Sequence, residues 1–397
     1  MNPHDVVITG IGLVSSLGEG VDAHWQRLTA ERPEPVVDAT RFPPYLIHPL
    51  PVIDWGLQIA KRGDQRQMET WQRLGTYAAG LALDDAAIKA DETLCATMDM
   101  VVAAGGGERD EAVDAAILEA SASRNDRDVL LNERLTTELR PTLFLAQLSN
   151  LLAGNISIVH KVTGSSRTFM GEEGAGVSAV ETAAARIRSG QSTHVLVGGA
   201  FQTEHHDMLL CYELAGYLHR GPWKPVWRRQ GSEGGGVVTG SGAAFLVLES
   251  REHAEKRGRL VYARLGPVAS GRIRRKSADL AAEIAALAAK AGVSGGEPML
   301  AISGASGAHA ATAAEKAAFD RMPDIAMRGV STLTGHMKEA QFPFAVALAA
   351  LAVRNNAAYP AFDAESEKPF KGALKAVLAT TVGYHQFEGM ALVVAAD

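Results

Sequence analysis

Short apolar runs alternate with longer segments of helical period along this chain, and that alternation restricts its fold more than any other feature. Eight short runs are typical of buried strands: residues 6–10, 100–103, 194–197, 244–248, 261–265, 299–302, 376–379 and 391–394. Between many of them lie segments with the apolar spacing of helices: residues 77–90, 177–188, 278–291 and 344–355. Alternating strands and helices predict an α/β fold in which helices pack on sheets.

One of these helices has a clear buried face. Its apolar side chains fall on one side: Val177, Val180, Ala184 and Ile187. A weaker pattern concerns the whole chain, because a glycine-rich stretch precedes an apolar strand at residues 234–248 and again at 383–394. This repetition predicts two similar halves, residues 1–250 and 251–397, as expected for a chain that is long for a single core.

Composition excludes several classes of protein. The formal net charge is −6, which gives no general electrostatic case for nucleic-acid binding. The longest apolar stretch, residues 344–353, is too short to span a bilayer, and the N-terminus shows no signal-peptide pattern. The only cysteines are Cys95 and Cys211, so no disulfide framework is expected. We therefore predict a cytoplasmic protein in which both thiols are buried and structural.

A series of motifs in a fixed order carries a family resemblance. The opening, residues 6–18, resembles that of the β-ketoacyl-acyl-carrier-protein synthases, the type II elongating condensing enzymes of thiolase fold. Further blocks are similar to that family in the same order: residues 148–157, 194–200, 221–223, 240–249, 253–258 and 331–336. The resemblance covers nearly the whole chain. It implies a thiolase-like, five-layered αβαβα fold of two similar halves, assembled as a dimer.

The resemblance marks a nucleophile position at the start of the helix that carries Val177. A condensing enzyme needs a cysteine thiolate there, which takes the acyl chain as a thioester. Alignment from either flank puts Glu173 at that position, with Glu172 before it. A carboxylate cannot carry an acyl chain as a thioester, so the resemblance is to a member without the condensing nucleophile. The alternative is that Glu172 and Glu173 are ordinary carboxylates that favour the helix dipole.

The family uses two histidines to stabilise the enolate that forms when malonyl-carrier protein loses carbon dioxide. Gly304 stands at the first-histidine position, and His309, five residues further on, is a possible substitute. His336 retains the second histidine, although a satisfied core histidine is the alternative interpretation. The lysine that precedes this motif in the family is Ser331 here.

The surroundings of this site also depart from the family pattern. Residues 337–343 are longer than the family's small side chains and are expected to crowd the site, and Pro343 disfavours an unbroken helix there. The family's glycine-rich gate is reduced to Gly383, with Tyr384 at the gating aromatic position. We expect a stiffer gate as a result. His385, the next residue, is either a substitute for proton transfer or a hydrogen-bonded loop histidine.

Three functional hypotheses follow from these departures. The leading one is a non-condensing partner subunit, similar to the chain-length factors of type II polyketide systems, which pair with a competent synthase and shape its acyl tunnel. A second is an active enzyme of the same family, either a malonyl-carrier-protein decarboxylase that depends on His336 or an acyltransferase that uses Glu173. A third is a binding module for acylated carrier protein without chemistry.

The resemblance also implies partners. An acyl carrier protein and a cysteine-bearing β-ketoacyl synthase paralogue are expected, or a second copy of this chain as a homodimer. No metal and no bound cofactor are implied; the carrier's phosphopantetheine arm is expected as substrate. The pathway stays open between fatty acids, very-long-chain lipid A acyl groups and polyketides. The densest basic patch is either a solvated loop or a contact for an acidic partner, and it comprises Arg272, Arg274, Arg275 and Lys276.

Overall fold

The computed structural model describes residues 2–275 and 279–396, so Lys276 and residue 278, the first of a predicted helix, lie outside the described residues. The main sheet follows one path of hydrogen-bonded neighbours. Its first half comprises β5 (Ser166–Phe169), β4 (Asp99–Ala103), β6 (His194–Phe201), β8 (Gly242–Ser250) and β1 (Val6–Ser15). Its second half comprises β9 (Ala263–Gly271), β13 (Glu388–Val394), β12 (Ala376–Val382), β10 (Met299–Ser303) and β11 (Ile325–Gly329).

The two halves repeat one pairing pattern. From the outer edge inward, β5, β4 and β6 are parallel, and β8 and β1 follow in antiparallel pairing. In the other half β11, β10 and β12 are parallel, and β13 and β9 follow in antiparallel pairing. The halves meet where Val7 pairs with Arg264 and Ile8 with Ala263. The chain therefore has the predicted thiolase-like α/β fold of two similar halves.

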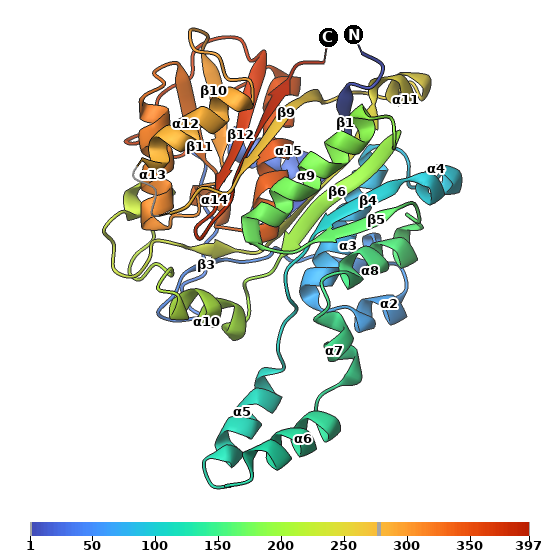
Figure 1. The fold of residues 1–397 in the computed structure, drawn as a ribbon, viewed down its shortest axis with the longest axis vertical. Coiled ribbons are helices and arrows are strands. Elements are labelled where there is room, and N and C mark those ends of the chain that lie inside the picture. Colours follow the sequence, from blue (N-terminus) through green and yellow to red (C-terminus); the bar gives the residue numbers. More distant parts are fainter. Residues whose placement is uncertain (1, 276–278, 397) are drawn as a thin grey trace.

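Helices complete the layers of the molecule (Figure 1). Each half of the main sheet forms one layer. Between these two sheet layers lie α9 (Glu172–Arg188) and α15 (Gln341–Asn355), whose apolar side chains form the central core with both layers. On the outer face of the first half lie α3 (Thr70–Asp85) and α8 (Leu151–His160). On the outer face of the second half lie α12 (Leu280–Lys290) and α13 (His309–Asp320). The order is helix, sheet, helix, sheet, helix.

Shorter elements connect these layers. The remaining α-helices are α1 (Gly20–Leu28), α2 (Arg62–Gln67), α4 (Glu92–Thr97), α5 (Glu111–Ser121), α6 (Arg127–Thr137), α7 (Pro141–Ala146), α10 (His206–Leu214), α11 (Arg251–Lys256) and α14 (Ser331–Thr334). Single turns of 3₁₀ helix form at Trp55–Leu57, Val226–Arg229 and Lys338–Ala340. Small strands β3 (Ile47–His48) and β7 (Thr239–Gly240) pair with each other, and β2 (Gly18–Glu19) pairs with β1. Figure 1 shows α5 and α6 projecting from the layered body.

The glycines near the N-terminus serve helix packing. Gly10 and Gly12 lie inside β1, where α3 crosses the strand closely. A Cβ on Gly10 would lie 2.7 Å from the Cβ of Ala86, and one on Gly12 would lie 2.6 Å from the backbone nitrogen of Ala82. The two glycines therefore allow α3 to approach β1 closely.

One expectation about the core is wrong. Pro343 does not interrupt a helix, because α15 runs unbroken from Gln341 to Asn355 with the proline as its third residue. In the first turn of a helix the backbone N–H groups have no intrahelical acceptor, so a proline costs little there. In the part of the chain that the structure describes, no helix is long and apolar enough to cross a membrane.

Candidate functional site

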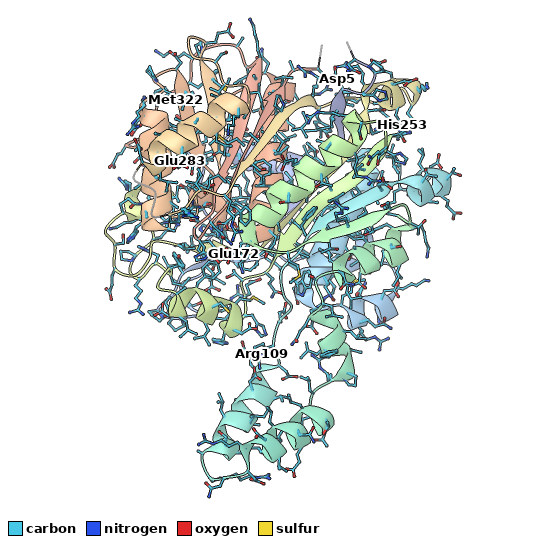
Figure 2. All side chains as sticks on the ribbon, viewed as in Figure 1. Asp5, Arg109, Glu172, His253, Glu283 and Met322 are labelled. Carbon is cyan, nitrogen blue, oxygen red and sulfur yellow. The ribbon has the colours of Figure 1, made fainter. Side chains whose placement is uncertain are left out.

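The site begins at the N-terminus of the buried helix α9. Gly171, just before the helix, has a φ of 120°, and Glu172, its first residue, has a φ of 51°. Positive φ is uncommon for a residue with a side chain, so this is a sharp turn from loop into helix. It leaves Glu172 half-buried and directs the side chain of Glu173 into the interior, where none of its surface is exposed. Figure 2 shows Glu172 near the centre of the molecule.

Glu173 faces His336, which lies just after α14 in the second half. The Oε1 atom of Glu173 is 3.0 Å from Nε2 of His336, and both side chains are fully buried. The atoms are close enough for an ion pair, although their angle does not meet that of a hydrogen bond. Burial alone would raise the pKa of the Glu173 carboxyl, but the charge of His336 lowers it below its usual range.

Tyr384 covers this pair from the loop after β12. Its backbone N–H donates a hydrogen bond of 3.1 Å to Oε1 of Glu173, and its hydroxyl donates to Oε1 of Glu172. The ring stands edge-on to the ring of His336, with 6.0 Å between centroids, and packs against Tyr212 and Tyr217. The predicted gating residue therefore holds both glutamates.

The remainder of the same loop seals the start of α9. The N–H of Gly383 donates to the carbonyl of Phe387 over 2.8 Å, which closes the loop on itself. Phe387 lies directly on the helix, since a Cβ on Gly174 would be 2.7 Å from Cγ of its ring. No thioester could reach Glu173 or His336 without movement of this loop, because neither side chain has exposed surface.

Gln341 fills the space beside Gly304, and the sequence analysis did not single this residue out. A Cβ on Gly304 would lie 2.9 Å from Cγ of Gln341. The Gln341 amide accepts a hydrogen bond of 2.8 Å from the N–H of Met337 and donates one of 3.2 Å to the hydroxyl of Ser331. One glutamine thus lies against both positions at which the family resemblance expected a histidine and a lysine. The expected crowding of the site by residues 337–343 is therefore due to the side chain of Gln341.

Glu315 is a second residue that sequence analysis missed. It lies on α13 with no exposed surface, and its Oε1 accepts hydrogen bonds from Ser303 over 2.9 Å and from Thr380 over 2.6 Å. Burial raises the pKa of this carboxyl to about 7. Gly304 directly follows Ser303, so an acid that titrates near neutrality borders the first-histidine position.

The two substitute histidines lie away from the pair. His309 begins α13, and its ring packs against Gly236, where a glycine Cβ would lie 3.0 Å from Nε2. His385 is exposed and lines a groove of about 570 Å³ together with the basic residues of the predicted patch. Within that groove Arg272 donates to the side chain of Gln386 and packs over the ring of Phe387, 5.3 Å from its centroid. The basic patch therefore adjoins the loop that seals α9.

The cysteines are not at the start of α9. Cys95 is buried in α4, as predicted, and burial raises the pKa of its thiol. Cys211 lies on α10 and is exposed, so the prediction that it is buried is wrong. The side chain of its neighbour Tyr212 takes an inward-facing position on that short helix, which leaves Cys211 in solvent.

This arrangement provides an ion pair, and neither cysteine of the chain lies beside His336. Glu173 is paired and inaccessible, and the residues around it are aromatic rings and hydrogen-bonded loop backbone. In the described ranges, one group of side chains has spacing suited to a metal ion, and it lies outside this site at Glu111, His205 and Asp207.

Comparisons with known proteins agree with the fold. The family model described as Beta-ketoacyl synthase, N-terminal domain, matches residues 4–254. The 3-oxoacyl-[acyl-carrier-protein] synthase 2 of Vibrio harveyi is 27% identical over 271 residues, which are 67% of this chain and 62% of that protein. That of Coxiella burnetii is 23% identical over 394 residues, 92% of this chain and 90% of that protein. The match thus spans 62% of the length of the first of these relatives.

Solved structures show the same architecture. A beta-ketoacyl synthase from Burkholderia phymatum STM815 superposes with a TM-score of 0.79 at 19% identity, covering 99% of this chain and all of that one. The ishigamide ketosynthase/chain length factor gives a TM-score of 0.77 at 21% identity, with 99% of each chain covered. A type II PKS ketosynthase in complex with its acyl-carrier protein gives 0.72 at 18% identity over the full length of both chains.

Proposed function

Because this chain belongs to the β-ketoacyl synthase family, we propose that it is a non-condensing subunit of fatty-acid or polyketide synthesis. In this role it pairs with a cysteine-bearing synthase and shapes the tunnel that receives the growing acyl chain. The proposal is supported by a fold similar to that of the ishigamide ketosynthase/chain length factor.

One observation carries this proposal. The residue at the start of α9 is a carboxylate that is paired with His336 and held by Tyr384, with no exposed surface. A thioester-forming nucleophile must be a thiol that its substrate can reach, and Glu173 meets neither condition. The rest of the layered core is intact, so selection for a stable scaffold accounts for the chain better than selection for its own condensing chemistry.

The edge of the first half offers a surface for the partner synthase. β5 ends the sheet, its outer edge has no paired strand among the described residues, and its four residues are at least partly exposed. An unpaired edge strand favours pairing with another chain. The projecting α5 and α6 add exposed apolar side chains: Leu118, Val129, Leu131 and Leu135. Large exposed aliphatic residues on a projecting segment favour burial against a partner.

The groove next to the gate loop suits an acidic carrier protein. It is about 570 Å³ in volume and is lined by Arg272, Arg274 and Arg275. Arg275 pairs with Glu388 and donates to the carbonyl of Gly383, so a charge bound in this groove acts on the loop that covers Glu173. An anionic partner docked there would lie beside the seal of α9.

Co-expression tests the role directly. We expect this chain and a cysteine-bearing paralogue from the same genome to co-purify as a one-to-one heterodimer by native mass spectrometry, and the product length of that synthase to change when this chain is omitted. Absence of a heterodimer with every such paralogue would refute the proposal.

Activity of the purified chain provides the opposing test. Release of carbon dioxide from malonyl-carrier protein, abolished in His336→Ala, would establish a decarboxylase instead. Binding of acylated carrier protein without any effect on a synthase would establish a binding module. The Arg272→Glu variant should weaken carrier-protein binding, with Arg321→Glu, an exposed arginine outside the groove, as the matched control.

A further inference from the structure

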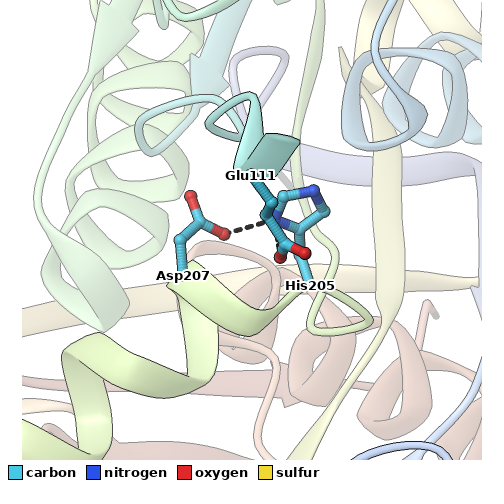
Figure 3. A group of neighbouring side chains, drawn as sticks. All are labelled: Glu111, His205 and Asp207. Carbon is cyan, nitrogen blue, oxygen red and sulfur yellow. Dashed lines mark hydrogen bonds and ion pairs between the residues drawn. The ribbon is translucent and has the colours of Figure 1, made fainter. Parts of the chain in front are cut away.

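A cluster of acidic and imidazole groups joins the projecting helix α5 to α10. Glu111 is the first residue of α5, and His205 and Asp207 flank the start of α10. Figure 3 shows the three side chains converging. Nδ1 of His205 lies 2.5 Å from Oδ1 of Asp207 and 3.1 Å from Oε1 of Glu111, and the three ligand atoms lie within 4.8 Å of one another. These distances bring the three donors to the separation that a single metal ion requires after small adjustments.

His206 supplies a further nitrogen. Its Nδ1 lies 2.9 Å from Oε2 of Glu111, and its backbone N–H donates to Oε1 of the same carboxylate over 2.8 Å. The donor set is therefore one imidazole and two carboxylates from two segments far apart in the sequence, with the second imidazole, that of His206, next to it. Nitrogen and oxygen donors in this proportion suit zinc and similar divalent transition metals better than magnesium or calcium.

A buried carboxylate, Glu108, lies near this cluster. Glu108 is 6% exposed, and its Oε1 has no hydrogen-bond partner among the described residues. The nearby cation Arg109 is engaged with Asp114 through its guanidinium. A buried carboxylate oxygen without a hydrogen-bond partner, close to the imidazole of His205, favours a cation nearby.

The cluster is also accessible. Glu111, His206 and Asp207 line one end of a groove of about 680 Å³ between α5 and α10, whose remaining walls include Phe42, Leu118 and Leu210. A metal ion could enter through the groove and keep one position open to it, which a fully enclosed structural site does not allow.

We propose that Glu111, His205 and Asp207, with His206 beside them, bind one divalent transition metal ion of the zinc class. The ion bonds to the lone pair on Nδ1 of the neutral His205 imidazole, whose single proton is then on Nε2, and to one carboxylate oxygen from Glu111 and one from Asp207. No oxidation or reduction is involved. Because the ligands come from α5 and from the start of α10, the bound ion fixes the base of the projecting helices relative to the body. This inference is independent of the proposed function.

Metal titration of the untagged full chain tests the site. After chelator treatment and dialysis, we expect saturable binding of one Zn²⁺ per chain by calorimetry, and weaker binding at a pH low enough to protonate the ligands. Co²⁺ should bind at the same stoichiometry and give the visible absorption of a low-coordinate site. Hydrogen exchange in α5 and α10 should slow when Zn²⁺ is added.

Two variants and two controls make the test specific. His205→Ala and Glu111→Gln should each weaken Zn²⁺ binding by more than about tenfold. Glu111 is partly exposed, so its substitution leaves the core untouched. His4→Ala and Glu119→Gln, an exposed histidine and an exposed glutamate on α5, should bind Zn²⁺ like the original chain. Absence of saturable binding, unchanged binding in Glu111→Gln and His205→Ala, or tighter binding of Mg²⁺ than of Zn²⁺ would each overturn the proposal.

Discussion

Oε1 of Glu173 lies 3.0 Å from Nε2 of His336, and neither side chain has any exposed surface. The two residues come from different halves of the molecule, one at the start of α9 and the other just after α14. Their pairing ties the central helix to the second half at the point where the family resemblance expected catalysis. The predictions below test whether this pair is structural and what surrounds it.

Substitution of one partner should destabilise the protein strongly. Glu173→Ala leaves His336 buried without a counter-charge, and losing one member of a buried ion pair costs about 3–5 kcal/mol. Glu181→Ala, on the solvent side of the same helix, removes only a hydrogen bond from Ser270 and should cost less than about 1 kcal/mol. Urea unfolding followed by circular dichroism measures both free energies of unfolding. Equal losses in the two variants would contradict a structural role for the pair.

Installing a thiol should not restore condensation. Glu173→Cys supplies the missing nucleophile, but Gly304 still provides no imidazole and Gln341 still occupies the neighbouring space. We expect no transfer of an acyl chain from acyl-carrier protein, measured by intact mass. The exposed Cys211 provides an internal reference, since it should react with iodoacetamide far faster than the buried thiol at position 173. A stable acyl-enzyme in this single variant would show that the site is more open than the structure indicates.

The gate loop should loosen when the Tyr384 hydroxyl is removed. Tyr384→Phe loses the hydrogen bond to Glu172, and a bond to a charged group is worth about 1.5–3 kcal/mol. We expect faster amide exchange across residues 383–389 and a loss of global stability no larger than this amount, because the ring still packs on Tyr212. Tyr217→Phe is the matched control, because that residue contacts Tyr384 through its ring. Identical exchange in both variants would refute the role assigned to the hydroxyl.

Glu315 should make stability depend on pH. Its pKa is raised by burial to about 7, above the ordinary value of 4.5 that it has in the unfolded chain. Its protonated form therefore contributes stability that is fully present below pH 4.5 and is lost as the pH rises through 7. Glu315→Gln removes this dependence. As the pH rises between these values, the free energy of unfolding of the variant should increase relative to that of the original chain by up to about 3 kcal/mol. Urea titrations of both proteins across this pH range measure the difference between their free energies of unfolding. A difference that does not change with pH would contradict the prediction.

Much of the fold could be predicted from sequence because its strands are buried on both faces. All eight predicted runs fall within or overlap strands, since sheets covered by helices on both sides need continuous apolar runs. β5 was missed because it is a short edge strand with the polar sequence Ser-Arg-Thr-Phe, half-exposed along its length. Its partner strand supplies the hydrogen bonds that its composition does not predict.

Sequence alone could predict where a site residue lies along the chain, but not which side chains it contacts in space. Position 173 follows from its distance to flanking glycines, and the structure has Glu173 at the start of α9 beside His336. Gln341 and Glu315 could not be found this way, because what they fill depends on how α15 and α13 pack against β10. The exposure of Cys211 was missed for a similar reason: the inward-facing positions of the short helix α10 are taken by Leu209 and Tyr212, and only the fold decides which residues face inward.

The Gln341 side chain also bears on how such a protein can change over generations. It spans from the N–H of Met337 to the hydroxyl of Ser331 and lies against Gly304. A histidine arriving alone at position 304 would collide with it, and a lysine arriving alone at position 331 would displace its hydrogen-bond acceptor. Either substitution alone would therefore be destabilising, so a return to the family pattern at positions 304 and 331 requires Gln341 to change as well.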